Sequence, residues 1–264
     1  MVSLTFSDAE LESQREHIAS FIAAQCEAAG VEGAVLGLSG GIDSTLTAYL
    51  AVEAIGPEAV HGLLLPSAVS STDSVTDAER VVEALGITHT EVTVEPVVDA
   101  LLEAYPDAAD DHEAVGNARA RVRAVLGYLV ANHENRLVVG TGNRSEAAVG
   151  YFTKYGDGGV DCHPIGNLYK AQVRQLAAHV GVPEDLVEKT PTAELWDDQT
   201  DEAELGMDYD TLDGVLALHV DGPLSPAATA RELGVDRAVV ERVRELYEAS
   251  AHKRAVPPSP PPLE

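Results

Sequence analysis

The residues best suited to chemistry stand in one short stretch, from Val35 to Ser44, where an apolar run leads into Ser-Gly-Gly and then an acid and hydroxyls. Adjacent glycines let the backbone turn tightly and approach a ligand closely. Amides that follow such a turn at the start of a helix form a nest for phosphate. Asp43 stands beside this nest, which makes sense if a divalent cation bridges it to phosphates. A plain strand-to-helix turn with Ser and Asp as caps explains the same residues.

The loop differs from two common phosphate-binding motifs. No Gly-Lys-Ser/Thr follows it, as a Walker A loop requires, and Gly-x-Gly-x-x-Gly is absent. The segment Ser39-Gly40-Gly41-Ile42-Asp43-Ser44 resembles the pyrophosphate-binding loop of the N-type ATP pyrophosphatases. That resemblance implies an enzyme that splits ATP between its α and β phosphates and adenylates an acceptor.

A second candidate segment runs from Thr141 to Glu146 and follows an apolar run. Glu146 is a candidate second carboxylate for the cation held by Asp43, because Mg²⁺ commonly takes one or two protein carboxylates and completes its shell with phosphate and water. A capped helix with an acid in its first turn is the alternative.

Cations are scarce in this chain, so their positions are informative. Only four lysines occur, and Lys154, Lys170 and Lys253 each stand in an unusual motif. Lys154 lies among aromatic residues and glycines, where rings can stack a heterocycle and a lysine can hold phosphate. Lys253 belongs to the basic run 252–254, which either complements a helix dipole or folds over an anionic substrate.

Three arginines crowd one expected helix. Arg119 and Arg123 are four residues apart and share a face, whereas Arg121 points elsewhere. One face can pair with surface acids and the other can reach a substrate phosphate, and the spacing leaves open which is which.

The elements that must position these residues alternate between strand-like and helix-like patterns. This alternation predicts an α/β fold, a single domain with a Rossmann-like, doubly wound parallel sheet flanked by helices. We expect the domain to span residues 1–256 and a proline-rich tail to follow at 257–264. The expected strands are 34–38, 60–65, 88–94 and 137–139, and the helices include 45–55, 76–85 and 114–132. Loops that leave the carboxyl ends of the strands should converge on one crevice.

Composition limits the function classes. The chain has 44 Asp+Glu against 17 Lys+Arg, for a net charge of −27. Such a surface repels nucleic acid and anionic membranes, so we expect neither as a partner. Lysine scarcity favours a protein adapted to a salt-rich cytoplasm, where charges are screened within about 3 Å at 1 M salt. No segment reads as a membrane span or signal peptide, which predicts a cytoplasmic protein. Cys26 and Cys162 are expected to be reduced thiols.

Four further segments extend the resemblance to the ammonia-dependent NAD synthetases, from Gly37 to about Arg254. They are Gly116–Arg121, Tyr151–Gly159, Lys189–Leu195 and His252–Arg254. The resemblance implies a homodimeric carbon–nitrogen ligase that amidates deamido-NAD to NAD. ATP would be the co-substrate, and the intermediate an adenylated deamido-NAD that forms as pyrophosphate leaves. Ammonia would then attack this intermediate and release AMP.

The resemblance also implies specific contacts in this sequence. The Mg²⁺ ligands would be Asp43 and Glu146. The ATP contacts would be Gly37, Leu38, Ser39, Gly40, Gly41, Ile42, Asp43, Ser44, Thr141, Lys170 and Thr192. The deamido-NAD contacts would be Arg121, Lys154, Asp161, His252 and Lys253. The catalytic groups would be Asp43, Lys170 and Asp161, the last as a candidate base for ammonium. The dinucleotide would lie across the subunit interface. The segment 192–205, with Trp196, is expected to cover the site and exclude water.

Features that the sequence lacks bear on the nitrogen donor and on rival functions. We expect free ammonia as the donor, because few residues precede the first strand and Cys26 lies on an expected helix, unless a separate glutaminase delivers it. A GMP synthetase subunit shares only the first loop, and a tRNA-modifying enzyme would need basic surface or catalytic cysteines. A nucleotide-sensing or DNA-binding protein is the rival from another class, since 225–247 resembles a helix-turn-helix.

Overall fold

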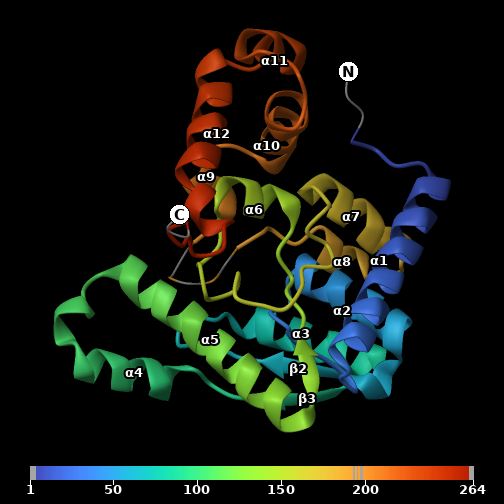
Figure 1. Ribbon diagram of the computed structural model, residues 1–264, viewed down its shortest axis with the longest axis vertical. Coiled ribbons are helices and arrows are strands. Elements are labelled where there is room, and N and C mark those ends of the chain that lie inside the picture. The colour runs from blue at the N-terminus through green and yellow to red at the C-terminus, as the bar shows by residue number, and fades with distance from the viewer. Residues whose placement is uncertain (1–3, 193, 195, 197–198, 262–264) are drawn as a thin grey trace.

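The computed structural model describes residues 4–192, 194, 196 and 199–261 (Figure 1). The strands are β1 (Gly33–Gly37), β2 (Val60–Leu64), β3 (Thr88–Glu91) and β4 (Arg136–Val138). The helices are α1 (Asp8–Ala29), α2 (Ile42–Ile55), α3 (Thr72–Leu85), α4 (Glu95–Ala104), α5 (His112–Glu134), α6 (Arg144–Val149), α7 (Lys170–His179), α8 (Glu184–Val187), α9 (Asp201–Leu205), α10 (Tyr209–Val215), α11 (Pro226–Leu233) and α12 (Arg237–Ala249).

The four strands form one parallel sheet in the order β3-β2-β1-β4, which confirms the predicted fold class. The chain builds outward from β1 to β3 and then returns to place β4 on the other side of β1. In a parallel sheet, the point where the strand order reverses opens a crevice at the carboxyl ends. Here that point lies between β1 and β4, so the loops that follow these two strands frame the crevice.

Helices cover both faces of the sheet (Figure 1). On one face, α1, α2, α3 and α7 enclose the largest apolar cluster, which includes Ala34 and Leu36 of β1. On the other face, α5 packs over β1 and β4, and Val35 joins Val138 there. Successive side chains of β1 therefore enter opposite layers, as the period of two in a strand dictates. A strand apolar on both faces is typical of a fully covered parallel sheet.

Several element boundaries differ from the sequence prediction. Helix α2 begins at Ile42 rather than at 45, because Gly41 is already its N-cap. Helix α3 begins at Thr72 rather than at 76, because the Ser71 hydroxyl accepts a hydrogen bond from the amide of Ser74 and caps the helix there. Strand β3 ends at Glu91 rather than at 94, and helix α4, which the prediction lacked, starts four residues later with a proline in its first turn.

A second apolar cluster lies beyond the sheet, in the lobe formed by α10, α11 and α12 at the top of Figure 1. Helices α11 and α12 do form a turn-linked pair, with Gly234 in the left-handed conformation between them. Val240 and Val243 of α12 pack into this lobe together with Leu212 of α10. The helix-turn-helix pattern therefore builds the core of the lobe.

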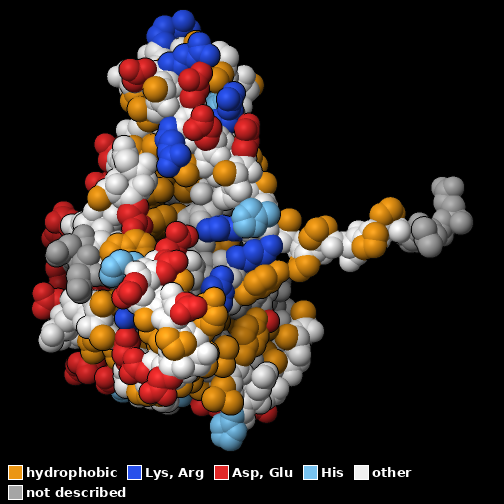
Figure 2. Space-filling model, turned by 90° about the vertical axis from the view of Figure 1, so that its left-hand side faces the viewer, with side chains coloured by type: hydrophobic (Ala, Val, Ile, Leu, Met, Phe, Trp, Pro, Cys, Tyr) orange, Lys and Arg blue, Asp and Glu red, His pale blue; other side chains and the backbone are white. Residues whose placement is uncertain are grey.

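Residues 254–261 are exposed, and Figure 2 shows a thin extension leaving the body. Acidic side chains are spread over the face in Figure 2, whereas basic ones gather beside the base of this extension and at the far end of the helical lobe. Among the described residues, no helix combines the length and the apolar character needed to cross a membrane. Both cysteines are buried and unpaired with each other, as expected for reduced thiols.

Candidate active site

A cleft of about 1430 Å³ opens at the carboxyl edge of the sheet. Its walls include the segments that follow β1, β2 and β4, so the predicted convergence of three loops is confirmed. Pockets for one drug-sized ligand usually measure about 300–1,000 Å³. This cleft is larger, which suits a pair of substrates held side by side.

The predicted phosphate loop forms the floor of this cleft between β1 and α2. Gly40 takes φ +74°, and a Cβ built there would lie 2.3 Å from the Ser74 carbonyl oxygen, so only glycine fits. The Ser39 hydroxyl accepts a hydrogen bond from the Gly41 amide at 3.3 Å, and the Ser44 hydroxyl donates to the Gly41 carbonyl at 3.0 Å. No side chain caps α2 at Gly41. The first amides of α2 are therefore available to an anion.

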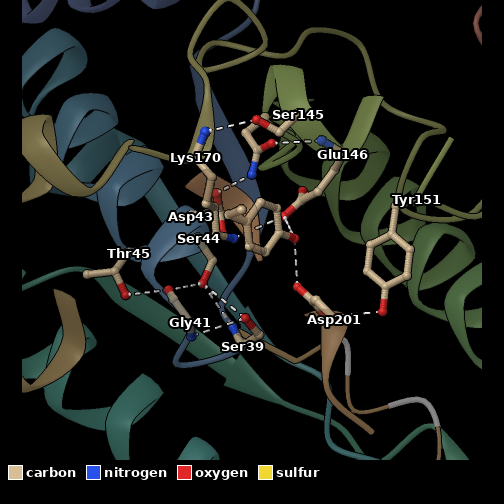
Figure 3. Close-up of polar contacts among 12 residues, drawn as sticks. Ser39, Gly41, Asp43, Ser44, Thr45, Ser145, Glu146, Tyr151, Lys170 and Asp201 are labelled. Carbon is tan, nitrogen blue, oxygen red and sulfur yellow. Dashed lines mark hydrogen bonds and ion pairs between the residues drawn. The ribbon is translucent and has the colours of Figure 1, made fainter. Parts of the chain in front are cut away.

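Lys170 joins two segments that are far apart in the sequence (Figure 3). Its Nζ lies 2.6 Å from Asp43 Oδ2 and 3.0 Å from Glu146 Oε1. The lysine is only 2 % exposed, although it begins α7. A buried ammonium requires such paired carboxylates, because the charge has lost its water. The three predicted residues thus form one ion cluster beside the phosphate loop.

Asn143 links the two acidic residues of this cluster, through the carboxylate of Asp43 and the backbone amide of Glu146. Its Oδ1 accepts a hydrogen bond from the Glu146 amide at 3.0 Å and so caps α6, while its Nδ2 donates to Asp43 Oδ1 at 2.8 Å. Asn143 is completely buried. The capped helix start that the sequence offered as an alternative for this segment is therefore present, with Asn143 as the cap.

The cluster gives its members unusual proton affinities. Burial raises the pKa of Glu146 to about 7, against the opposing charge of Lys170. Burial alone would lower the pKa of Lys170, but the charges of Asp43 and Glu146 outweigh it, so the pKa lies above its ordinary value. Lys170 is therefore a permanent cation at neutral pH, and a negative phosphate that approaches it meets a fixed positive charge.

The two carboxylates suit a hard divalent cation in kind, since Mg²⁺ prefers oxygen donors and commonly uses one or two carboxylates beside substrate phosphates. Two protein carboxylates stand here around one ammonium. Within the described part of the chain, no group of three or more His, Cys, Asp or Glu residues gathers as a metal site. The residues present therefore fit a cation that takes its remaining ligands from phosphate and water.

The two predicted threonine contacts of ATP also border the cleft. Thr141 follows β4 and Thr192 lies across from it. The Thr192 hydroxyl donates to the carbonyl of Gln199 at 2.7 Å.

Lys189, which received no role in the sequence analysis, also lines the cleft. It donates to Asp77 Oδ2 at 2.7 Å and to the Gly40 carbonyl at 3.4 Å. The sequence feature that could have pointed to Lys189 is the scarcity of lysine in the chain.

The predicted dinucleotide contacts fall into two groups: Lys154, His252 and Lys253 near the end of α12, of which Lys253 alone lines the cleft, and two residues that lie apart from them. Lys253 lines the cleft and donates to the carbonyls of Gly150 and Phe152 at 2.8 and 2.9 Å. Lys154 donates to the backbone carbonyl of His252, which joins the two predicted basic segments. This part of the site connects the end of α12 to the loop that follows α6.

The other group, Arg121 and Asp161, does not line the cleft. Arg121 is exposed on the outer face of α5, whereas Arg119 and Arg123 border the cleft, so the predicted division of the three arginines is confirmed. Asp161 accepts hydrogen bonds from the Tyr128 hydroxyl at 3.1 Å and the Val138 amide at 2.8 Å. The roles predicted for Arg121 and Asp161 remain predictions.

The segment predicted to cover the site is described in part. Residues 193, 195, 197 and 198 lie outside the described residues. Trp196, Gln199 and Asp201 line the cleft. The Asp201 amide donates to the Pro191 carbonyl at 3.3 Å, which brings residues 191 and 201 together beside the cleft.

Comparisons with known proteins agree with this geometry. The family described as NAD synthase matches residues 14–257. An NH₃-dependent NAD⁺ synthetase of Halobacterium salinarum is 61 % identical over 259 residues, covering 98 % of this chain and 97 % of the relative. One of Hyperthermus butylicus is 48 % identical over 256 residues, covering 97 % and 92 %.

Solved structures agree as well. An NMN synthetase from Francisella tularensis superposes with a TM-score of 0.83 at 35 % identity, covering 97 % of this chain and 99 % of the other. An NH₃-dependent NAD synthetase from Campylobacter jejuni, in complex with the nitrate ion, gives 0.79 at 27 % identity, covering 95 % and 99 %. The family match over residues 14–257 and the near-full-length identity to these relatives show that this chain belongs to the NAD synthase family.

Proposed function

We propose that this protein amidates deamido-NAD to NAD with ammonia and ATP, through an adenylated intermediate with release of AMP and pyrophosphate. The observation that carries the proposal is the position of Lys170. Its ammonium lies against Asp43 in the first turn of α2, directly after the phosphate loop. A fixed buried cation beside a glycine loop suits a departing pyrophosphate rather than a neutral product.

The chemistry explains why these groups are needed. A carboxylate is a poor acyl donor because oxide is a very poor leaving group, and adenylation turns it into a mixed anhydride. During this adenylation step, negative charge develops on the departing pyrophosphate. Lys170 and the amides at the start of α2 stabilise that charge without reorganising. Ammonia attacks the activated carbonyl in the second step, which must exclude water to prevent hydrolysis.

Asp43 and Glu146 would hold Mg²⁺ in this proposal. When bound, the ion neutralises charge on the phosphates. The chain's own contribution is to orient the Asp43 carboxylate and the first turn of α6, which carries Glu146, through Asn143. The remaining proposed contacts are Thr141 and Thr192 for ATP and Lys154, His252 and Lys253 for deamido-NAD. Asp161 would be the base that accepts a proton from ammonium.

The protein would act as a homodimer, and the exposed face of α5 supports this part of the proposal. Val125 and Leu129 are 66 % and 63 % exposed and lie one and two turns along the helix from Arg121. Leu101 and Tyr105, at the end of α4, are also exposed. If a second copy covers this face, Arg121 reaches the dinucleotide of the partner rather than its own cleft, which accounts for its position outside the cleft.

The experiment is an exchange assay. Purified protein is supplied with ATP, labelled pyrophosphate and deamido-NAD, first without and then with ammonium. Deamido-NAD-dependent exchange without ammonium, and NAD formation with it, are the expected results. A parallel reaction with nicotinic acid mononucleotide tests the smaller substrate suggested by the NMN synthetase relative. Exchange with the mononucleotide alone would reassign the acceptor, and exchange with neither compound would refute the proposal.

A further inference from the structure

The ion cluster of the site is connected to a second polar network through one buried tyrosine. Tyr209, the first residue of α10, is 1 % exposed. Its hydroxyl lies 2.8 Å from Asp201 Oδ2 and 3.3 Å from Glu146 Oε1. The Lys170 ammonium lies 4.9 Å from the centre of its ring. One side chain therefore contacts the cation and one carboxylate of the cluster, as well as a further carboxylate outside it.

Lys170, Glu146 and Asp201 line the cleft, whereas Tyr209 is buried behind its surface and is not among the described residues that line it. We therefore expect any effect of Tyr209 on catalysis to pass through these three neighbours. A cation over an aromatic face is attracted more strongly when both are removed from water. The ring also fills the space beside the lysine, which restricts the long side chain to the conformation that faces Asp43.

Asp201 gives the tyrosine its anchor. Its carboxylate is buried and accepts hydrogen bonds from Tyr209 and, at 3.1 Å, from the Tyr151 hydroxyl (Figure 3). The Asp201 amide is bonded to the carbonyl of Pro191, next to the proposed ATP contact Thr192. The contacts thus run without a break from the Pro191 end of this segment through Asp201 and Tyr209 to the lysine beside the phosphate loop.

We propose that Tyr209 is a positioning residue, which holds Lys170 and Glu146 in the arrangement that receives pyrophosphate and ties that arrangement to the segment ending at Asp201. This inference rests on the proposed function for its catalytic consequence. The phenol has a single proton, which it shares between Asp201 at 2.8 Å and Glu146 at 3.3 Å. Among the described residues, removing the hydroxyl therefore leaves the Asp201 carboxylate with the Tyr151 hydroxyl alone and the Glu146 carboxylate with Lys170 alone.

The test compares Tyr209→Phe with Tyr169→Phe. Both variants keep the ring and lose a hydroxyl that donates to a carboxylate, but Tyr169 donates to the exposed Asp221, which is not a member of the cluster. For Tyr209→Phe we expect kcat to fall by about tenfold, as the loss of a hydrogen bond to a charged group would produce. The KM for deamido-NAD should stay unchanged, because Tyr209 contacts none of the residues proposed to bind it. Tyr169→Phe should match the wild type.

Two further measurements separate positioning from folding. The Tyr209→Phe and Asp201→Ala changes should not add in kcat, because they act through the same contact. Calorimetry with inorganic pyrophosphate should show a several-fold weaker affinity for Tyr209→Phe than for the wild type, and this readout does not need turnover. A kcat and a pyrophosphate affinity equal to those of the wild type would overturn the inference. Equal losses of kcat in Tyr209→Phe and Tyr169→Phe, in proportion to their losses of thermal stability, would also overturn the inference.

The two proposals fail in different ways. A wild-type protein that makes no NAD would refute the proposed function, while pyrophosphate binding would still decide the role of Tyr209. A wild type that makes NAD, with Tyr209→Phe equally active, would refute only the positioning role.

Discussion

Lys170 Nζ lies 2.6 Å from Asp43 Oδ2, although 127 residues separate the two in the chain. The pair joins the start of α7 to the start of α2, and with Glu146 it forms a buried cation between two acids. Both carboxylates are less exposed than a typical surface acid, so water screens the attraction poorly. The pair therefore supports both the proposed chemistry and the stability of this edge of the sheet.

Replacing Lys170 with Met should abolish deamido-NAD-dependent pyrophosphate exchange and also destabilise the fold. The change leaves two acids facing each other without a cation, and breaking a buried ion pair typically costs about 3–5 kcal/mol. Adding Asp43→Asn to Lys170→Met should restore part of the stability and none of the activity. Urea unfolding and the exchange assay measure the two effects. Exchange that persists in the single variant would contradict the role of the lysine.

The affinity for a divalent cation should depend on pH near neutrality. A cation binds the ionised form of Glu146, and burial raises the pKa of this carboxyl to about 7. Below pH 7 the cation must displace a proton, so its affinity should fall as pH drops from 8 to 6. Titration of the protein with Mg²⁺ alone measures this, because added pyrophosphate would itself gain protons over the same pH range. Glu146→Gln should bind more weakly and lose the dependence. A wild-type affinity independent of pH over this range would exclude Glu146 as a ligand.

Gly40→Ala should be strongly destabilising, and Gly30→Ala supplies the matched control. Both glycines have positive φ, +74° and +66°, so both substitutions strain the backbone. A Cβ at Gly40 would lie 2.3 Å from a backbone oxygen, whereas nothing lies within 4 Å of one at Gly30. We expect about 1 kcal/mol from strain at Gly30 and a clearly larger loss at Gly40, together with loss of activity. Thermal unfolding of the two variants compares them, and equal losses would show that the loop adjusts.

Placing a charge on the outer face of α5 should separate the proposed dimer. Val125→Glu introduces an acid among exposed apolar side chains, where a second copy would otherwise bury them. Light scattering should report a monomer, and activity should fall with the oligomeric state. Val256→Glu is the control, since Val256 is 84 % exposed on the tail. A monomeric wild type with full activity would contradict the dimer.

Stability should increase with KCl concentration. The net charge of −27 means that acidic side chains repel one another at low ionic strength. Salt at about 1 M shortens the screening length to about 3 Å and so weakens this repulsion. Urea unfolding at increasing KCl tests this proposed adaptation. Sucrose of equal osmolarity is the control, because it is excluded from the surface without screening charge. A stability that is already complete in dilute buffer would refute the adaptation to salt.

The sequence by itself determined the sheet and the phosphate loop, and it singled out Asp43, Glu146 and Lys170 as candidate site residues without showing that they pair. Strands apolar on both faces and a glycine turn before a helix are local patterns, so Gly33–Gly37 and the loop to Ser44 were predictable within a few residues. The parallel topology then fixed that Asp43 and Thr141 would share one edge. Local pattern failed at α4, because its start directly follows the alternating segment 88–94, which reads as a longer strand.

Only the tertiary structure decided which partners the functional residues have. The sequence does not say toward which other element a side chain points. The hydrogen bond from Asn143 to Asp43 and the position of Tyr209 against Lys170 could therefore not be read from spacing. The same limit applies to Arg121, whose helical period placed it on the opposite face from Arg119 but could not say which face borders the cleft. Periodicity describes one element, whereas contacts between α6, α7 and α10 depend on how separate elements pack.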